Sequence, residues 1–232
     1  MIVIKSDRTI EPFGIKMSRE SSIALMASSE TANEEVNGYN GEIDFGATLK
    51  NIEYEIQGII EHPDNINRQK AIDYVVAKFI ECMGPTELTY EAIPNIFTYA
   101  RVTGNPDFIP YPSFTRITFN LRINPFWYGV TEKSLTGNGT LINDGTFETG
   151  LIIEITGPAV SPSLSIGNDT LSYQGTINEG QTLVIDTEKQ TVKVGNNNAN
   201  NKYNKVFPLL PPGEINITAT DNITIRWRDK WI

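Results

Sequence analysis

The chain has 232 residues, of which 39% are hydrophobic and 20% are charged, so it can bury a core and does not have the composition of a disordered chain. Its formal net charge of −9 argues against binding to nucleic acid or to an anionic membrane surface, because both need clustered Lys and Arg. This length fits one large β domain or two modest ones.

Cysteine usage and the distribution of apolar residues indicate the compartment. Cys82 is the single cysteine, so an internal disulfide is impossible. The sequence does not open with a basic segment and a long apolar stretch, and no apolar run approaches the roughly 20 residues that span a bilayer. We therefore expect synthesis in a reducing cytoplasm and no insertion into a membrane.

The first part of the chain predicts short strands separated by a polar segment. Apolar runs at residues 2–4 and 22–27 predict strands. Apolar and polar residues alternate over 52–56, which is the period of a half-buried strand. The stretch 27–42 is rich in Ser, Glu, Asn and Gly, and this composition predicts an exposed loop.

One helix is predicted over residues 67–83. Residues 63–65 offer N-terminal caps, and Gly84-Pro85 ends the helix because Gly tolerates a left-handed conformation and Pro cannot continue the helix. Apolar residues follow the i, i+3, i+4, i+7 spacing of one stripe: Ile72, Val75, Val76, Phe79, Ile80 and Met83. We interpret this stripe as core packing, with a groove for a partner as the alternative.

Three further strands complete the first half. Two are expected near residues 88–93 and 96–102. The clearest spans 117–123, where apolar residues alternate with Thr, Asn and Arg. It stops at Asn124-Pro125, since Pro cannot donate to a central ladder. We place the domain boundary near residues 124–131.

The second half has no helical period and predicts a β-sandwich or jelly roll. Turn residues separate eight short apolar runs, at residues 140–142, 151–156, 163–166, 170–173, 182–186, 191–194, 214–219 and 222–227. The last run places Ile223, Ile225 and Trp227 on one face. An Asn-rich loop is expected at 196–201.

The residues that usually carry chemistry are few. His62 is the only histidine, which excludes a His-based triad or a multi-His metal site within one chain. We interpret His62 as a surface or turn residue. Cys82 falls near the helix end beside Glu81, without the basic neighbour that a thiolate nucleophile prefers. We interpret it as a structural thiol.

Acidic residues are plentiful, but no spacing selects a catalytic pair. The candidates Glu34-Glu35, Glu53/Glu55 and Asp221 are interpreted as solvated. Gly137-Asn138-Gly139 lacks the Lys and Ser/Thr of a phosphate loop, and no calcium-loop pattern occurs. We therefore predict a protein that is not an enzyme, with no catalytic residue, cofactor or metal.

The tryptophans bear on an alternative function. Trp227 falls on an apolar strand face and is expected in the core. Phe126-Trp127-Tyr128 lies at the predicted domain junction, where we expect interdomain packing, and Trp231 is penultimate. The alternative function is a carbohydrate-binding module for host cell-wall polysaccharide, which would use Trp127 and Trp231 as stacking platforms.

An ordered series of segments then suggests a family. They are residues 122–129 (RINPFWYG), 142–149 (INDGTFET), 153–158 (IEITGP), 161–163 (SPS), 179–187 (EGQTLVIDT), 192–195 (VKVG), 207–217 (FPLLPPGEINI) and 223–228 (ITIRWR). In this order they resemble the distal tail (Dit) family of siphovirus-type, long-tailed bacteriophages. The resemblance is specific from residue 122 onward and covers the whole chain in layout.

The resemblance implies a mainly β fold in two domains. Residues 1–128 would be an N-terminal ring-forming belt domain containing a single α-helix, and residues 129–232 a C-terminal galectin-like β-sandwich. The second half has no histidine, so the usual His-centred galectin sugar site is not expected.

The resemblance also implies a function in the virion, at the phage tail tip. A homo-oligomer, expected as a hexameric ring, would link the tail tube protein to the tail-tip or baseplate adsorption apparatus, including tail-associated and receptor-binding proteins. Such a ring encloses a channel for DNA without reading its sequence. Acidic residues lining that channel would keep DNA from adhering.

Overall fold

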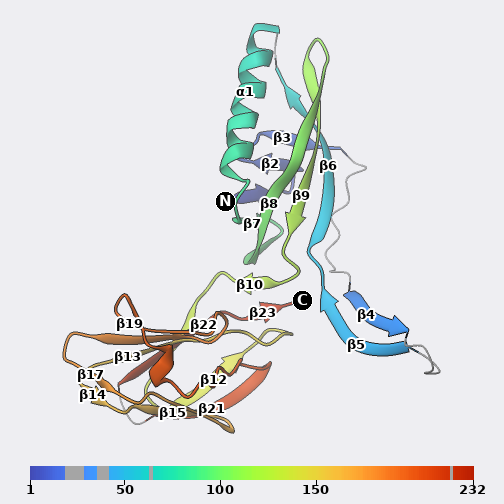
Figure 1. Cartoon of the computed structure of the whole chain (residues 1–232). Helices are drawn as coiled ribbons and strands as arrows, with labels where there is room; N and C mark the ends of the chain where they lie inside the picture. The colour runs from blue at the N-terminus through green and yellow to red at the C-terminus, as the bar shows by residue number, and fades with distance from the viewer. Residues whose placement is uncertain (19–28, 36–41, 63–64, 220–221) are drawn as a thin grey trace. The chain divides into compact units, whose positions relative to one another are not determined.

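The computed structural model describes residues 1–18, 29–35, 42–62, 65–219 and 222–232. Figure 1 shows a mainly β chain, and the described residues contain one α-helix and one short 3-10 helix. The chain folds into two compact units, Met1–Trp127 with Ile232, and Tyr128–Trp231. In the described part of the chain, no helix is long and apolar enough to cross a membrane. The predicted fold class, mainly β with one helix and a C-terminal sandwich, is confirmed.

Seven strands of the first unit form a closed barrel. The order is β8-β7-β1-β2-β3-β6-β9, and β8 also pairs with β9, which closes the ring of strands. Only β1 and β7 pair in parallel. Their bounds are β1 Ile2–Ile4, β2 Thr9–Glu11, β3 Ile15–Met17, β6 Ile52–Glu61, β7 Thr86–Tyr90, β8 Ile93–Pro110 and β9 Phe114–Ile123. Because each strand is paired on both sides over part of its length, closure removes most exposed edges.

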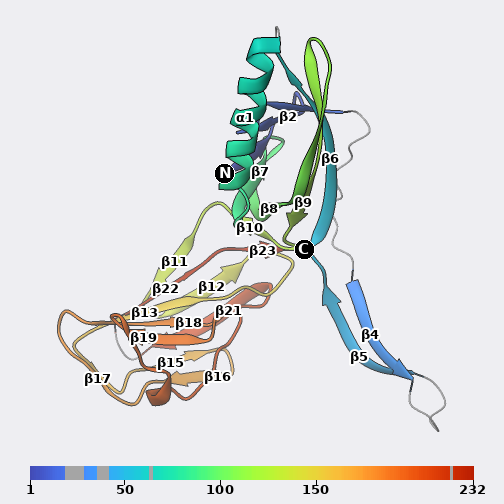
Figure 2. The same cartoon turned by 45° about the horizontal axis from the view of Figure 1, so that its top comes forward.

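Helix α1 (Asn65–Glu81) connects β6 to β7 and lies beside the barrel strands in Figures 1 and 2. Its Phe79 ring lies 4.8 Å from both Phe13 and Phe119, measured between centroids. These three rings and Val75 are almost fully buried. The aromatic cluster therefore attaches the helix to the barrel.

The predicted helical stripe is only partly core. Val75 and Phe79 are buried, but Val76, Ile80 and Met83 are exposed by 37%, 62% and 56%. The curved wall of a closed barrel contacts a narrow arc of the helix, so one half of the stripe packs and the other half faces solvent.

The expected loop over residues 27–42 is wrong where the structure describes it. Residues Ser29–Glu35 form β4, which pairs antiparallel with β5 (Glu42–Leu49) in a separate two-stranded sheet. Backbone pairing with the next strand made a strand of a polar sequence, because the ladder uses main-chain groups that every residue carries. The strand expected at 22–27 lies outside the described residues.

The other strands predicted in the first half are confirmed, with shifted bounds. The strand expected near 88–93 is β7, which ends at Tyr90 before a turn. Strand β8 continues to Pro110, past the predicted end at 102, because its ladder with β9 resumes after a register shift between Thr103 and Asp107. Gly104 supplies the positive φ of 70° within this irregularity. A Gly-Asn-Pro sequence is typical of a turn, so the sequence did not predict that the strand continues beyond residue 102.

The second unit is a sandwich of two sheets. The six-stranded sheet has the order β11-β22-β13-β18-β19-β20, and the four-stranded sheet has the order β12-β21-β15-β16. The bounds are β11 Lys133–Thr136, β12 Gly139–Asn143, β13 Ile152–Thr156, β15 Ser163–Ile166, β16 Asp169–Ser172, β18 Thr182–Asp186, β19 Thr191–Val194, β20 Asn197–Asn198, β21 Gly213–Ala219 and β22 Ile223–Trp227. All eight predicted runs are strands.

Alternation along these strands builds the core. Ile225, Ile153 and Ile185 form a row across β22, β13 and β18, and all three are buried. Leu164 and Ile217 of the other sheet belong to the same core cluster. Each such side chain contributes roughly 1.5–3 kcal/mol through burial.

Short elements were missed by the sequence. They are β2, β3, β10 (Trp127–Gly129), β11, the pair β14 (Ala159–Val160) and β17 (Thr176–Ile177), β20, and β23 (Lys230–Trp231). The Asn-rich loop instead holds β20 and the 3-10 helix Asn200–Lys202. Asn200 Oδ1 accepts a hydrogen bond from Val192 N at 2.6 Å, so a side-chain amide here satisfies a backbone donor.

Candidate functional site

The cysteine occupies a structural position. Cys82 follows the end of α1, is 4% exposed and forms no disulfide. Burial raises the pKa of the Cys82 thiol. A buried thiol held in its neutral form is a poor nucleophile, which agrees with the interpretation as a structural thiol.

The interpretation of His62 as a surface or turn residue is wrong. It is 4% exposed, and its Nε2 lies 3.1 Å from Thr115 Oγ1, with which it shares a hydrogen bond. Its backbone N–H donates to Ser113 O at 3.2 Å. The histidine follows the end of β6 and contacts the start of β9, so the β6–β9 pairing buried a residue whose local sequence resembles a turn.

The acidic candidates do not gather into a catalytic pair in the described residues. Glu53 and Glu55 are exposed on β6, where their partners across the ladder are Arg122 and Asn120. The side chains of Glu34-Glu35 and all of Asp221 lie outside what the structure describes. Among the described residues, no group of three or more His, Cys, Asp and Glu could hold a metal.

The tryptophans are placed differently from one another. Trp227 is buried as predicted and donates from Nε1 to Ile142 O at 3.0 Å. Trp127 is only 6% exposed, with its ring centroid 5.5 Å from that of Tyr90 within the first unit. Trp231 is half-buried. Of the two glycan-binding candidates, Trp127 therefore does not present a free face for a sugar, and the alternative rests on Trp231. The expected interdomain packing of residues 126–128 stays a prediction.

A polar network joins the two ends of the second unit. Lys133 Nζ donates to Asp144 at 2.6 Å and lies 2.9 and 2.7 Å from the two carboxylate oxygens of Asp229. Burial disfavours the charge on Lys133, but its hydrogen bonds to Asp144 and Asp229 outweigh that effect and raise its pKa. Asp229, 8% exposed, also accepts from Asp144 N at 3.1 Å. We call these three residues the Lys133 network.

The close approach of two segments in this region depends on Gly145. A Cβ there would lie 2.1 Å from Lys230 O, so only glycine lets the chain end pass. Phe147 N donates to Lys230 O at 2.9 Å, and Asn143 Oδ1 accepts from Gly145 N at 3.0 Å. Two segments of the ordered series, 142–149 and 223–228 with the residues after it, thus meet at one place.

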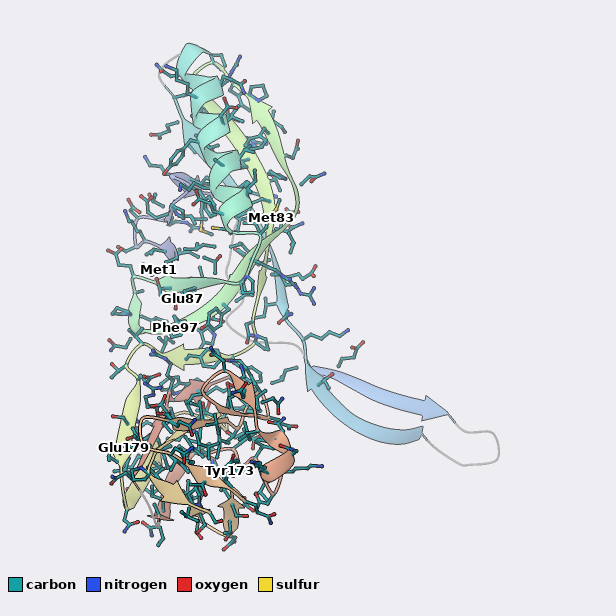
Figure 3. All side chains as sticks on the ribbon, turned by 60° about the vertical axis from the view of Figure 1, so that its left-hand side comes forward. Met1, Met83, Glu87, Phe97, Tyr173 and Glu179 are labelled. Atoms are coloured by element: carbon teal, nitrogen blue, oxygen red, sulfur yellow. The ribbon has the colours of Figure 1, made fainter. Side chains whose placement is uncertain are left out.

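The first unit has apolar side chains exposed on its surface. Beyond the exposed part of α1, Ile109 and Tyr111 are exposed at the tip of the β8–β9 hairpin, where the Tyr111 ring stacks on Phe114 with centroids 4.6 Å apart. Met83, labelled in Figure 3, lies two residues after the end of α1 and is also exposed. Exposed apolar surface of this kind is typical of contacts with other proteins.

Comparison with known proteins identifies the family. A family model described as "Phage tail protein RIFT-related domain" matches residues 8–122. A second, described as "Siphovirus-type tail component, C-terminal domain", matches residues 144–231. The chain belongs to the siphovirus distal tail protein (Dit) family. The predicted resemblance is confirmed, and the protein is a structural component of the phage tail and is located in the virion.

Solved structures agree on the fold. The crystal structure of Dit from phage SPP1, described as a paradigm of the hub adsorption apparatus in phages that infect Gram-positive bacteria, matches with a TM-score of 0.73 at 16% identity over 94% of each chain. A chain of the phage P2 baseplate in its activated conformation with Ca matches with a TM-score of 0.50 at 10% identity, over 97% of this chain and 94% of that one. No curated protein sequence matches.

Proposed function

We propose that six copies of this Dit family member form a ring that links the tail tube to the tail-tip or baseplate adsorption apparatus. The observation that carries the proposal is the pair of matched families in one chain, together with the fold shared with SPP1 Dit over 94% of both chains. The first unit, residues 1–128 in our division, forms the ring, and the galectin-like sandwich, residues 129–232, projects toward tail-tip and receptor-binding proteins.

The chemistry of the described residues supports a role in assembly. The single cysteine is buried, and the single histidine is buried and hydrogen-bonded to a threonine. No metal-binding cluster occurs in the described ranges. Exposed apolar side chains instead lie on α1 and on the β8–β9 hairpin. Such surfaces suit contacts that repeat from copy to copy around a ring. We therefore propose that the protein is not an enzyme.

We also propose that acidic residues line the channel of the ring. The chain has an excess of nine negative charges, and like charge would keep DNA from adhering during passage. Electrostatic potential mapped on an experimentally determined ring tests this. A basic channel wall would contradict it.

Mass and shape of the purified protein test the ring. Six copies of 25.9 kDa give a particle of roughly 155 kDa if the contact closes on itself. Light scattering and negative-stain imaging are expected to show it, alone or with tail tube protein as template. A lone monomer under both conditions would contradict the proposal.

The carbohydrate-binding alternative has its own measurement. Calorimetry against purified cell-wall polysaccharide, lost on Trp231→Ala and retained on Trp227→Phe, would favour it. We expect no binding above background, because Trp127 is buried and Trp231, the candidate that remains, is half-buried.

A further inference from the structure

Arg116 is a cation on the outer face of the barrel. It lies on β9 between Thr115 and Ile117, which are both fully buried, so its own side chain points away from the barrel interior. The guanidinium carbon lies 5.9 Å from the centroid of the Tyr111 ring, which is a cation–π distance. The side chain is exposed and takes part in no ion pair within the described ranges. Its N–H donors therefore have no carboxylate partner among the described residues.

Apolar side chains flank Arg116 on both sides. In the ladders of β6, β9 and β8, its register partners are Ile59 on one side and Ile109 on the other. Ile59 is half-buried and Ile109 is exposed. Phe114, two residues before Arg116 on the same strand face, stacks on Tyr111 with ring centroids 4.6 Å apart. Because apolar neighbours exclude water, an ion pair formed here would be stronger than one in open solvent.

Two hollows adjoin at Ile59. The first has a volume of about 370 Å³ and is lined in part by Lys16, Ile59 and Arg116. The second has a volume of about 470 Å³ and is lined in part by Ile59, Glu61 and Phe114. Both volumes lie within the roughly 300–1,000 Å³ that is typical of ligand sites. We call Lys16, Ile59, Glu61, Phe114 and Arg116 the Arg116 groove.

The Arg116 groove has one positive charge that is not neutralised. Lys16 Nζ lies 3.2 Å from Glu61 Oε1, so these two residues form an ion pair with each other. Arg116 remains as the net charge of the groove, in a chain whose formal net charge is −9. A planar guanidinium binds a carboxylate through two parallel hydrogen bonds. The apolar flanks suit apolar side chains next to that carboxylate.

A nucleic acid fits this surface less well than an acidic peptide does. Binding to the phosphate backbone needs clustered Lys and Arg, whereas the groove has a single cation without an acidic partner. The observed pattern, one arginine between apolar side chains, favours a protein segment in which Asp or Glu stands next to apolar residues.

We propose that the Arg116 groove binds an acidic segment of a neighbouring tail protein, with an Asp or Glu carboxylate on Arg116 and apolar side chains on Ile59 and Phe114. The inference rests on the proposed function for the identity of that neighbour as a tail protein. It assigns to the first unit a recognition site and the chemistry of the segment that the site takes.

A pair of synthetic peptides tests the chemistry on the full chain. The probe is dansyl-labelled Leu-Glu-Leu-Glu-Leu, and its control has Gln in place of Glu. Fluorescence anisotropy is expected to show about tenfold tighter binding of the Glu peptide, and Arg116→Gln is expected to remove that difference. Arg116→Lys should give an intermediate affinity, because lysine keeps the charge but not the paired donors. Far-UV circular dichroism confirms that each variant is folded.

Arg101→Gln is the matched control variant. Arg101 is exposed on the same outer face, on β8, but its register partner on β9 is Arg122 and not an apolar residue. Its replacement removes the same charge outside the groove and should leave peptide binding unchanged. Equal losses in Arg101→Gln and Arg116→Gln would overturn the proposal, as would equal binding of the two peptides. Displacement of the Glu peptide by a short DNA duplex would also overturn it.

Purified tail proteins of the same phage test the partner. Surface plasmon resonance is expected to show that the tail tube protein or a tail-tip protein binds about tenfold more weakly to Arg116→Gln than to wild type or Arg101→Gln. Unchanged binding of both proteins would overturn the assignment. If Arg116→Gln alone failed to form the ring that the wild type forms, a second copy would occupy the groove, and the proposed partner would be wrong. A chain that binds the Glu peptide as expected but never assembles, even with tail tube protein, would instead refute the proposed function and leave the groove standing.

Discussion

Replacing Asp229 with asparagine is expected to destabilise the second unit by about 2 kcal/mol. The carboxylate of Asp229 is largely buried and lies 2.7 and 2.9 Å from Lys133 Nζ, and it accepts from Asp144 N at 3.1 Å. A hydrogen bond to a charged group contributes about 1.5–3 kcal/mol. Asparagine has the same shape and one acceptor oxygen but no charge. Lys133 still has Asp144 as an ion-pair partner in the variant, so the loss of stability is smaller than for an unpaired buried ion.

The thermal consequence follows from the size of the unit. For a domain of about 100 residues, 1 kcal/mol corresponds to about 4–8 °C in Tm, so the transition of the second unit should fall by roughly 10 °C. Differential scanning calorimetry of the full chain measures it. Asp169→Asn is the matched control, because Asp169 is exposed at the turn into β16 and no ion pair involves it in the described residues.

The pH dependence gives a second readout of the same variant. The pKa of Lys133 is raised above its ordinary value of 10.5 in the folded chain. Its contribution is therefore complete below that value and is lost only as pH rises through the raised folded pKa. The difference between wild type and Asp229→Asn should stay constant from pH 6 to 8 and shrink in strong alkali. A variant as stable as the Asp169→Asn control would refute the reasoning.

Three further predictions concern the first unit. Phe79→Ala should lower the free energy of unfolding, measured in denaturant, by about 3–5 kcal/mol, because the aromatic cluster is lost. Ile80→Ala, on the exposed side of the helix, should lower it by less than about 1 kcal/mol. Equal losses would contradict the observed burial. Gly58→Ala should destabilise the barrel, because the added Cβ would lie 2.4 Å from a side chain of β3. Gly84→Ala should leave the stability unchanged, because the space around Gly84 is open. Thermal unfolding of the two variants compares them. Cys82 should react with iodoacetamide at least tenfold more slowly in the native chain than in urea, since burial limits access and raises the thiol pKa; equal rates would show an open thiol.

Local sequence determined the strands of the second unit and the family. Each of the eight predicted runs is a strand, because period-two alternation between turn residues is written within a few residues of sequence. The order of the segments carried the resemblance. The physical reason for Gly145, where any side chain would meet Lys230, lies instead in a contact with a segment distant in sequence. The prediction that the protein is not an enzyme rests on counts alone, one histidine and one cysteine.

Tertiary structure alone decided which apolar and polar residues are buried in the first unit. The helix was predicted at residues 67–83 and is observed at Asn65–Glu81, and Gly84 does not take the left-handed conformation expected of a cap. Only contact with a closed barrel separates Phe79, which is buried, from Ile80, which is exposed. The burial of His62 arises from contact with Thr115, 53 residues further along the chain. Such contacts join segments across long separations, and no local pattern records them. The exposure of Val76 and Ile80 on α1 therefore became visible only in three dimensions.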